Sequence, residues 1–359
     1  MPALRSKIGQ MFMVGLTGEE LSRDDERFLE EYPFGGFIFF GHNLKSPEQI
    51  LYFCRSLWEC GVTLPPFLAI DEEGGRVHRL PAPFSHFPPA AALGRTVNAD
   101  LARRVGRAIA RELSSVGINL DFAPVLDVHS NPHNPVIGDR SLSSDPEQVI
   151  NLGWAFAQGL RAGGVIPCGK HFPGHGDTST DSHFELPVVK KPLDALKAME
   201  LAPFRHACQN QIESLMTAHV LYPVLDPEFP ATLSPAILQG LLRRTLGYRG
   251  VIFSDDLEMK AISAKYGLEE AALLGVAAGA DGLLFCHDAE KAARALDLLC
   301  RRAEETSSIR ERVEESYARI RELKLRRLSC FSGVPERELK KFIGITRHRR
   351  IIAEIQGSR

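Results

Sequence analysis

The fourteen residues at 170–183, KHFPGHGDTSTDSH, concentrate groups that can carry out chemistry. They include three histidines, two aspartates and one lysine, and they follow an apolar run at 164–166. Charged side chains are seldom placed at the end of a buried strand for packing alone, so this density needs a chemical reason. The stretch predicts a functional site, and metal binding and proton transfer are the two chemistries that fit it.

A metal site is the first of these hypotheses. The potential ligands are His171, His175, Asp177, Asp181 and His183. Two histidines four residues apart share a helix face in zinc proteases. Here Pro173, Gly174 and Gly176 intervene, which makes the segment a loop. No CxxC or HxH pattern adds support, so the sequence disfavours a metal.

Cleavage of a glycosidic bond is the second hypothesis. It needs a carboxylate nucleophile on one side of the sugar and a proton donor on the other. A histidine titrates near neutrality and can give a proton to the leaving oxygen and then take one from water. An aspartate bonded to its ring would favour the imidazolium, and Asp181 and His183 fit such a dyad. From composition alone, a solvated polar loop is the other interpretation.

Eight short apolar runs, each ending in glycine or polar residues, predict eight β-strands. They lie at 11–15, 36–40, 67–70, 119–123, 165–169, 214–218, 251–253 and 282–285. Stretches with helical spacing separate them, such as 101–113 and 193–208. This α/β alternation predicts a single (β/α)8 TIM-type barrel. An open doubly wound sheet is the alternative, although no GxGxxG follows the first strand to support a dinucleotide-binding form.

Polar side chains follow six of the eight predicted strands, at Asp71, Asp127, Lys170, His219, Asp255 and His287. In a parallel barrel the carboxyl ends of all strands open onto one face, where active sites are built. We therefore expect these residues to converge in one pocket. Considered by itself, a group such as Ser254-Asp255-Asp256 could be the N-terminal cap of a helix. Capping does not explain why polar residues follow six of the eight predicted strands.

The composition is that of an ordinary globular enzyme. Of 359 residues, 44% are hydrophobic and 25% charged, and a net charge of −2 gives no electrostatic reason to expect nucleic acid or a membrane as partner. Seven cysteines without a CxxC pair predict reduced thiols, and the polar start predicts no signal peptide. We expect a cytoplasmic protein without a cofactor, and a monomer is the default.

The chain divides into a barrel domain at 1–330 and a C-terminal extension at 331–359. Apolar residues spaced between 309 and 320 predict an amphipathic helix that closes the barrel. The extension carries the basic residues Lys340, Lys341, Arg347, Arg349 and Arg350 among isoleucines. A helix packed on the barrel wall is favoured over a basic patch for an acidic ligand, and the sequence assigns the extension no function.

The motif KHFPGHG at 170–176, followed by DSH at 181–183, resembles the signature of family 3 glycoside hydrolases of the bacterial β-N-acetylglucosaminidase type. Four further stretches agree, IDEEGGRVHRL at 70–80, DFAPVLDV at 121–128, GDRS at 138–141 and FSDDLEM at 253–259. The resemblance implies a cytoplasmic enzyme of peptidoglycan recycling. Its substrate would be the muropeptide N-acetylglucosaminyl-β-1,4-anhydro-N-acetylmuramic acid, with or without peptide.

The resemblance also implies roles for individual residues. Asp255 would be the nucleophile of a retaining mechanism, His183 the general acid/base and Asp181 its partner. The sugar would be bound by Asp71, Arg79, Arg140, Lys170 and His171. The residues themselves do not decide between Asp255 and its neighbour Asp256 as nucleophile.

Supporting roles fall to His175 and Asp177, which we expect to hold the loop in shape, and to His219, which we expect under the pocket. Many family members carry a second α/β domain that supplies a carboxylate acid/base. This chain is too short for one, which agrees with a histidine acid on the barrel.

Three alternatives stay open. A neutral histidine does not repel a phosphate dianion, so the same dyad could serve a β-N-acetylglucosaminide phosphorylase. A metal-dependent hydrolase and a non-catalytic sugar-binding barrel are the others. Intact Asp181, His183 and Asp255 speak against the last.

Overall fold

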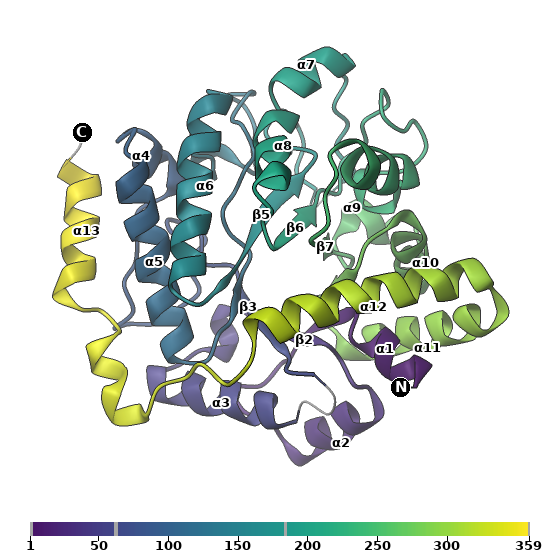
Figure 1. Cartoon of the computed structure of the whole chain (residues 1–359), viewed down its shortest axis with the longest axis horizontal. Coiled ribbons are helices and arrows are strands. Elements are labelled where there is room, and N and C mark those ends of the chain that lie inside the picture. Colours follow the sequence, from purple (N-terminus) through teal and green to yellow (C-terminus); the bar gives the residue numbers. More distant parts are fainter. Residues whose placement is uncertain (1–2, 61–63, 183–184, 358–359) are drawn as a thin grey trace.

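The computed structural model describes residues 3–60, 64–182 and 185–357, and its eight parallel strands close into a barrel (Figure 1). Each strand pairs with the next in sequence, and β8 pairs with β1. The strands are β1 (Phe12–Gly15), β2 (Gly36–Phe39), β3 (Phe67–Ile70), β4 (Leu120–Asp121), β5 (Ile166–Phe172), β6 (Ser214–Thr217), β7 (Val251–Asp256) and β8 (Gly282–Phe285). The predicted (β/α)8 barrel is confirmed, and the open sheet is excluded.

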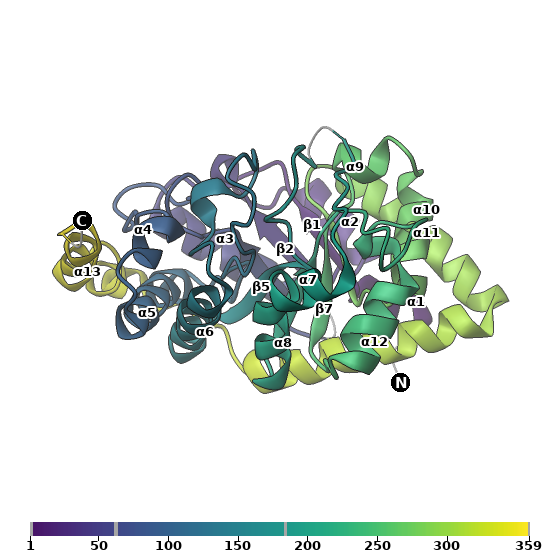
Figure 2. The same cartoon turned by 90° about the horizontal axis from the view of Figure 1, so that it is seen from above.

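Helices surround the barrel, as Figures 1 and 2 show. They are α1 (Leu4–Gly9), α2 (Arg23–Glu31), α3 (Pro47–Glu59), α4 (Ala90–Gly94), α5 (Ala99–Ser115), α6 (Pro146–Ala162), α7 (Leu193–Ala198), α8 (Leu201–Gln209), α9 (Lys260–Ser263), α10 (Leu268–Ala278), α11 (Ala289–Glu305), α12 (Ser307–Arg327) and α13 (Thr346–Gly357). Short 3₁₀ segments are η1 (Gly41–Asn43), η2 (Gly138–Arg140), η3 (Ala231–Leu233) and η5 (Glu336–Lys341), and η4 (Ala236–Thr245) is a π-helix. No helix in the described parts of the chain is long and apolar enough to cross a bilayer.

Side-chain caps start several of these helices. Ser22, Ser46, Asn98, Asp145 and Asp288 each accept a hydrogen bond from a backbone N–H of the first turn, which satisfies donors that the helix itself leaves free. The helical spacing at 193–208 becomes two helices, α7 and α8, which are separated at residues 199 and 200.

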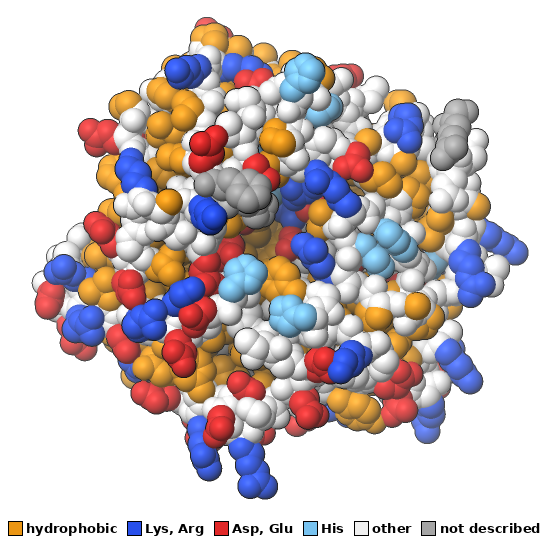
Figure 3. Space-filling view, turned by 180° about the vertical axis from the view of Figure 1, so that it is seen from behind, with side chains coloured by type: hydrophobic (Ala, Val, Ile, Leu, Met, Phe, Trp, Pro, Cys, Tyr) orange, Lys and Arg blue, Asp and Glu red, His pale blue; other side chains and the backbone are white. Residues whose placement is uncertain are grey.

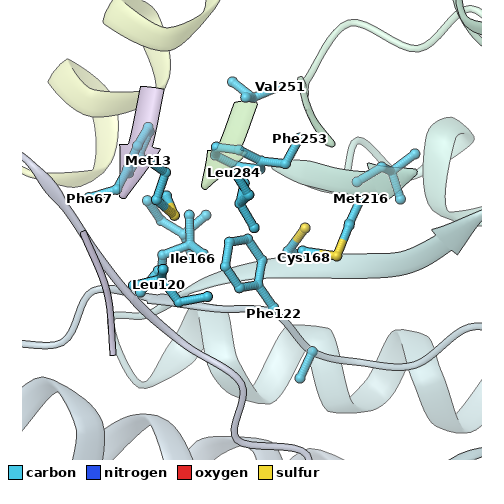
Figure 4. Close-up of a cluster of buried hydrophobic side chains, with 14 of the residues drawn as sticks. Met13, Phe67, Leu120, Phe122, Ile166, Cys168, Met216, Val251, Phe253 and Leu284 are labelled. Atoms are coloured by element: carbon cyan, nitrogen blue, oxygen red, sulfur yellow. The ribbon is translucent and has the colours of Figure 1, made fainter. Parts of the chain in front are cut away.

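The inside of the barrel is filled by apolar side chains (Figure 4). The rings of Phe67 and Phe122 both pack edge-on against Phe253, with centroids 5.7 Å apart in each pair. Met13, Leu120, Ile166 and Leu284 complete this layer. The barrel is therefore a packed core and not a pore, and a deep site is expected where the strands end, at the carboxyl face.

Helix α12 lies across the amino-terminal end of the barrel (Figure 1). Its fully buried Lys324 donates from Nζ to Gln10 Oε1 at 2.7 Å and to the Gly35 carbonyl at 2.6 Å. The same Nζ lies 4.6 Å from the centroid of the Phe67 ring. Burial lowers the pKa of this lysine well below its usual range. The helix predicted to close the barrel does so.

The C-terminal extension packs on the barrel wall, where α13 contacts α4 and α5. Buried Glu112 of α5 accepts hydrogen bonds from His348 Nδ1 at 2.6 Å, Gly344 N at 3.0 Å and Ser85 N at 2.8 Å. We propose that the domain boundary lies near residue 330, because α12 ends at Arg327 and the chain then crosses to α5.

Candidate active site

A pocket of about 540 Å³ opens at the carboxyl ends of the strands. Figure 3 shows this face, with a hollow near its centre bordered by acidic, basic and histidine side chains. The described residues that line the pocket include Asp71, Arg79, Arg140, Lys170, His171, Asp181 and Asp255. Of the six strand-end residues expected to converge, Asp71, Lys170, Asp255 and His287 line the pocket, whereas Asp127 and His219 do not.

Two strands each contribute consecutive residues to the pocket, although successive side chains of a regular strand point to opposite faces. The pairing of β5 with β6 shifts register between Gly169 and Phe172, around Lys170 and His171. The pairing of β7 with β8 shifts between Phe253 and Asp256, around Asp255. Such irregularities re-aim side chains next to active sites.

Lys170 is buried beside two carboxylates. Its Nζ lies 2.5 Å from Asp71 Oδ1 and 2.7 Å from Glu73 Oε1. Burial by itself would lower the pKa of Lys170, but the charges of Asp71 and Glu73 outweigh it and raise that pKa. Lys170 is therefore a fixed cation in the pocket wall.

Arg140 reaches the same carboxylate from η2. Its Nε and one terminal nitrogen bind the two oxygens of Glu73, both at 2.8 Å. Burial would raise the pKa of Glu73, but Arg140 and Lys170 lower it far below its usual range. Glu73 thus positions two predicted sugar-binding cations. The sequence analysis assigned it no role, although it is the third acid of the cluster after β3.

Arg79 is the third predicted cation. Its backbone N–H donates to Glu72 Oε2 at 3.1 Å, and its guanidinium lies 5.9 Å from the centroid of the Phe40 ring. Its Nε is buried and has no hydrogen-bond partner among the described residues. Because a buried donor without a partner costs free energy, the Nε–H of Arg79 is a group to which a polar ligand in the pocket could bind.

His171 is oriented by Asp127. Its Nδ1 lies 2.6 Å from Asp127 Oδ2, and the His171 N–H donates to Asp127 Oδ1 at 3.1 Å. Burial would raise the pKa of Asp127, but His171 and the bond from the His175 N–H lower it. An ionised Asp127 holds the proton on Nδ1 of His171 and leaves Nε2 for a ligand. Asp127 is a second residue whose role the sequence analysis missed.

His175 braces the loop that carries the predicted acid/base. Its Nδ1 lies 3.0 Å from Thr178 Oγ1, and its Nε2 lies 3.1 Å from Ser182 Oγ. Burial, followed by the charge of His171, lowers the pKa of His175 to about 4, so the ring is neutral at physiological pH. Lys191 Nζ lies 3.0 Å from Asp177 Oδ1. These contacts agree with the loop-holding roles expected for His175 and Asp177.

Asp181 lines the pocket, and its carbonyl accepts the N–H of Glu185 at 3.1 Å. The Ser182 carbonyl accepts the N–H of Ala261 at 3.2 Å. Because Ala261 lies in α9, which follows β7, this bond ties Ser182 to the helix next after the strand that carries Asp255. His183, the predicted acid/base, lies outside the described residues.

The pKa values of the two neighbouring aspartates of β7 are shifted in opposite directions. Burial would raise the pKa of Asp255, but His219, His171 and the Asp256 N–H, which donates to Asp255 Oδ1 at 2.8 Å, lower it. Burial raises the pKa of Asp256 to about 6. Its Oδ1 accepts the N–H groups of Glu258 and Cys286 at 3.1 and 3.2 Å. Asp255 is thus the more readily ionised carboxylate.

His219 is fully buried beneath β7. Its Nδ1 lies 2.8 Å from Thr232 Oγ1, and its Nε2 lies 2.9 Å from the Asp256 carbonyl. The ring therefore supports the strand end that presents Asp255, as the sequence analysis expected of a residue under the pocket.

Among the possible metal ligands, His171, His175 and Asp177 are engaged with other partners. Within residues 3–60, 64–182 and 185–357, no three His, Cys, Asp or Glu side chains are grouped so that they could hold a metal ion. His171 and His175 direct ring nitrogens to Asp127, Thr178 and Ser182.

Comparison with known proteins gives a consistent result. Residues 3–323 match the family described as "Glycosyl hydrolase family 3 N terminal domain". A protein from Thiobacillus denitrificans named beta-hexosaminidase is 38% identical over 286 residues, which are 78% of this chain and 79% of that protein.

Two solved structures are also similar. A family 3 β-N-acetylglucosaminidase from Paenibacillus sp. str. FPU-7 aligns with a TM-score of 0.94 and 39% identity, over all of this chain and 69% of its own. NagZ from Neisseria gonorrhoeae, solved with N-trifluoroacetyl-D-glucosamine, aligns with a TM-score of 0.79 and 31% identity over 97% of each chain.

Proposed function

The chain belongs to glycosyl hydrolase family 3, and we propose that it is a retaining β-N-acetylglucosaminidase. Membership of this family makes it a glycoside hydrolase. The release of a terminal β-linked N-acetylglucosamine is inferred from the names of its relatives and from the polar pocket at the barrel mouth. The observation that carries the proposal is the carboxylate of Asp255 at a strand end, in a pocket that Lys170 and Arg140 also line.

We propose that Asp255 attacks the anomeric carbon. The glycosidic C–O bond breaks as the covalent glycosyl–Asp255 ester forms, and the leaving oxygen takes a proton from His183. Water then loses a proton to His183 and displaces Asp255, so that the anomeric configuration is retained. Asp181 would orient His183 and favour its charged form. Asp255 is preferred over Asp256, because Asp255 is the more exposed to the pocket, whereas Asp256 is buried and its Oδ1 already accepts two backbone N–H groups.

The sugar would lie against Asp71, Arg79, Arg140, Lys170 and His171. Charged groups form strong hydrogen bonds to hydroxyl and carbonyl oxygens. Because Glu73 and Asp127 hold Lys170, Arg140 and His171 in place, these donors are already aimed before a sugar binds.

For the natural substrate we propose the muropeptide N-acetylglucosaminyl-β-1,4-anhydro-N-acetylmuramic acid, with or without peptide, in cytoplasmic peptidoglycan recycling. All seven cysteines are free, as a reducing compartment would keep them. We further propose that the protein acts as a monomer, because one barrel already brings Asp71, Lys170 and Asp255 into the same pocket.

Turnover of 4-nitrophenyl N-acetyl-β-glucosaminide tests this function. We expect Asp255→Ala to lower kcat/KM by about 10³-fold or more. We expect His183→Ala to lower it much less, because 4-nitrophenolate leaves without a proton. Near-wild-type turnover by Asp255→Ala would show that the nucleophile is another group. Formation of N-acetylglucosamine 1-phosphate from inorganic phosphate would identify a phosphorylase instead, and loss of activity on chelation would identify a metal-dependent enzyme.

A further inference from the structure

A second polar hollow lies on the barrel wall, between α5 and the C-terminal helix α13. Figures 1 and 2 both show α13 running beside α5. The hollow encloses about 150 Å³, and its floor is apolar, at Ala108, Ala162 and Ile351. Five arginines line it, Arg103, Arg104, Arg107 and Arg111 of α5 and Arg347 of α13, against one carboxylate, Asp100. None of these residues lines the active-site pocket.

The spacing of the arginines along α5 places like charges next to one another. Arg103, Arg107 and Arg111 are spaced four residues apart, so they lie on one face of α5. Like charges at this spacing destabilise a helix. At this face α6 approaches the backbone of α5 through glycine, and a Cβ at Gly159 would lie 2.2 Å from the Arg103 carbonyl. An anionic ligand bound to the arginines would offset the repulsion between them.

The carboxylates nearby neutralise only part of this charge. Arg104 binds both oxygens of Glu354, at 2.6 and 2.9 Å, and Asp100 at 3.0 Å. Arg103 lies 3.5 Å from Asp100. Among the described residues, neither Arg107 nor Arg347 has an ion-pair partner within 4 Å, and both are exposed.

Two further features keep the hollow positive. The guanidinium of Arg111 lies 5.5 Å from the centroid of the Phe342 ring, a contact that does not cancel its charge. Arg347 lies in the first turn of α13, where the helix dipole adds positive potential. That turn holds no acidic residue to offset it. His348 in the same turn is bound to Glu112 and supplies no acceptor to the hollow.

We propose that this groove between α5 and α13 binds a phosphate group of a small soluble molecule, with Arg107 and Arg347 as the principal donors. One planar guanidinium group can bind two phosphate oxygens at once. Arg107 and Arg347 line the groove from different helices, so they would bind the phosphate from two sides. The apolar floor would receive the part of the ligand that carries the phosphate. This site is separate from the active-site pocket, so the proposal does not depend on the proposed hydrolase activity. The site lies between α5 and the C-terminal extension.

Isothermal titration of the full chain with inorganic pyrophosphate, at physiological ionic strength, tests the proposal. We expect saturable binding with one site per chain. The variant Arg107→Gln/Arg347→Gln should weaken it by about tenfold or more, since two charge-assisted contacts are lost. The control Arg337→Gln/Arg350→Gln removes two exposed arginines that do not line the groove, and it should bind as the wild type does.

Three results would overturn the proposal. The first is no saturable binding by the wild type, and the second is equal weakening in the control, which would indicate diffuse attraction by net charge. The third is binding of heparin without binding of pyrophosphate, which would indicate a surface for a polyanion. Turnover of the nitrophenyl substrate is measured in parallel, and failure there concerns only the proposed hydrolase function.

Discussion

His175 Nε2 lies 3.1 Å from Ser182 Oγ, so a neutral buried histidine holds the residue between Asp181 and His183. The Ser182 carbonyl accepts the Ala261 N–H at 3.2 Å. Ser182, next to the predicted acid/base, is therefore held from two sides, through its side chain and its backbone. These two hydrogen bonds of Ser182 would help to position the neighbouring acid, although Ser182 itself takes no part in the reaction.

We predict that Ser182→Ala lowers kcat/KM for a disaccharide substrate by about tenfold or more, because a poor leaving group depends on a well-placed acid. For the 4-nitrophenyl glycoside, kcat/KM should change little. The control is Ser179→Ala, which alters an exposed serine of the same loop. Equal losses on both substrates would mean that the bond supports the whole pocket and not the acid.

We predict that Glu73→Gln lowers kcat/KM on both substrates, mainly through KM, by about 10- to 100-fold. The amide keeps the shape of the side chain but removes the charge between Lys170 and Arg140. Two buried cations would then repel each other, and breaking a buried pair typically costs about 3–5 kcal/mol. Steady-state kinetics and urea unfolding measure the two effects. Unchanged KM and stability would contradict the role of Glu73.

We predict that Asp256→Asn stabilises the protein at alkaline pH. The pKa of Asp256 is about 6 in the folded protein, which is above the pKa of an aspartate in the unfolded chain. Ionisation of Asp256 therefore opposes folding, and the full cost applies above pH 6. The cost decreases as the pH falls below 6 and vanishes once the pH has passed through the unfolded pKa. The asparagine should be more stable by on the order of 1–2 kcal/mol at pH 8 and nearly equal at pH 4. Denaturant unfolding across this range is the measurement. A pH-independent difference would contradict it.

We predict that removing residues 331–359 destabilises the barrel. Buried Glu112 would lose the bonds from Gly344 and His348 and keep only those from Ser85, and an unsatisfied buried charge costs several kcal/mol. A lower Tm with the nitrophenyl activity retained below it would agree with a supporting extension. As a control, Glu112→Gln in the full chain should lower Tm less, because the amide oxygen can still accept these N–H groups.

The sequence by itself determined the barrel. Apolar runs such as 67–70 and 282–285 recur with helices between them, and their alternation is a local property that packing of the barrel preserves. The barrel then brings Asp71, Lys170 and Asp255 together, because their positions at strand ends are also readable from the chain. The loop-holding role of His175 was expected before the contacts of its ring with Thr178 and Ser182 were seen.

Only the tertiary structure decided which groups neutralise one another. Glu73 meets Lys170 and Arg140, and Asp127 meets His171, across 44 to 97 residues of sequence, which local patterns do not relate. The opposite pKa shifts of Asp255 and Asp256 follow from burial and from neighbours such as His219 and His171 beside Asp255, although both residues are aspartates in adjacent positions. The same holds for Arg107 and Arg347, which become one groove only because α13 packs on α5. Electrostatic interaction depends on distance and burial in space, and these are set when the chain folds.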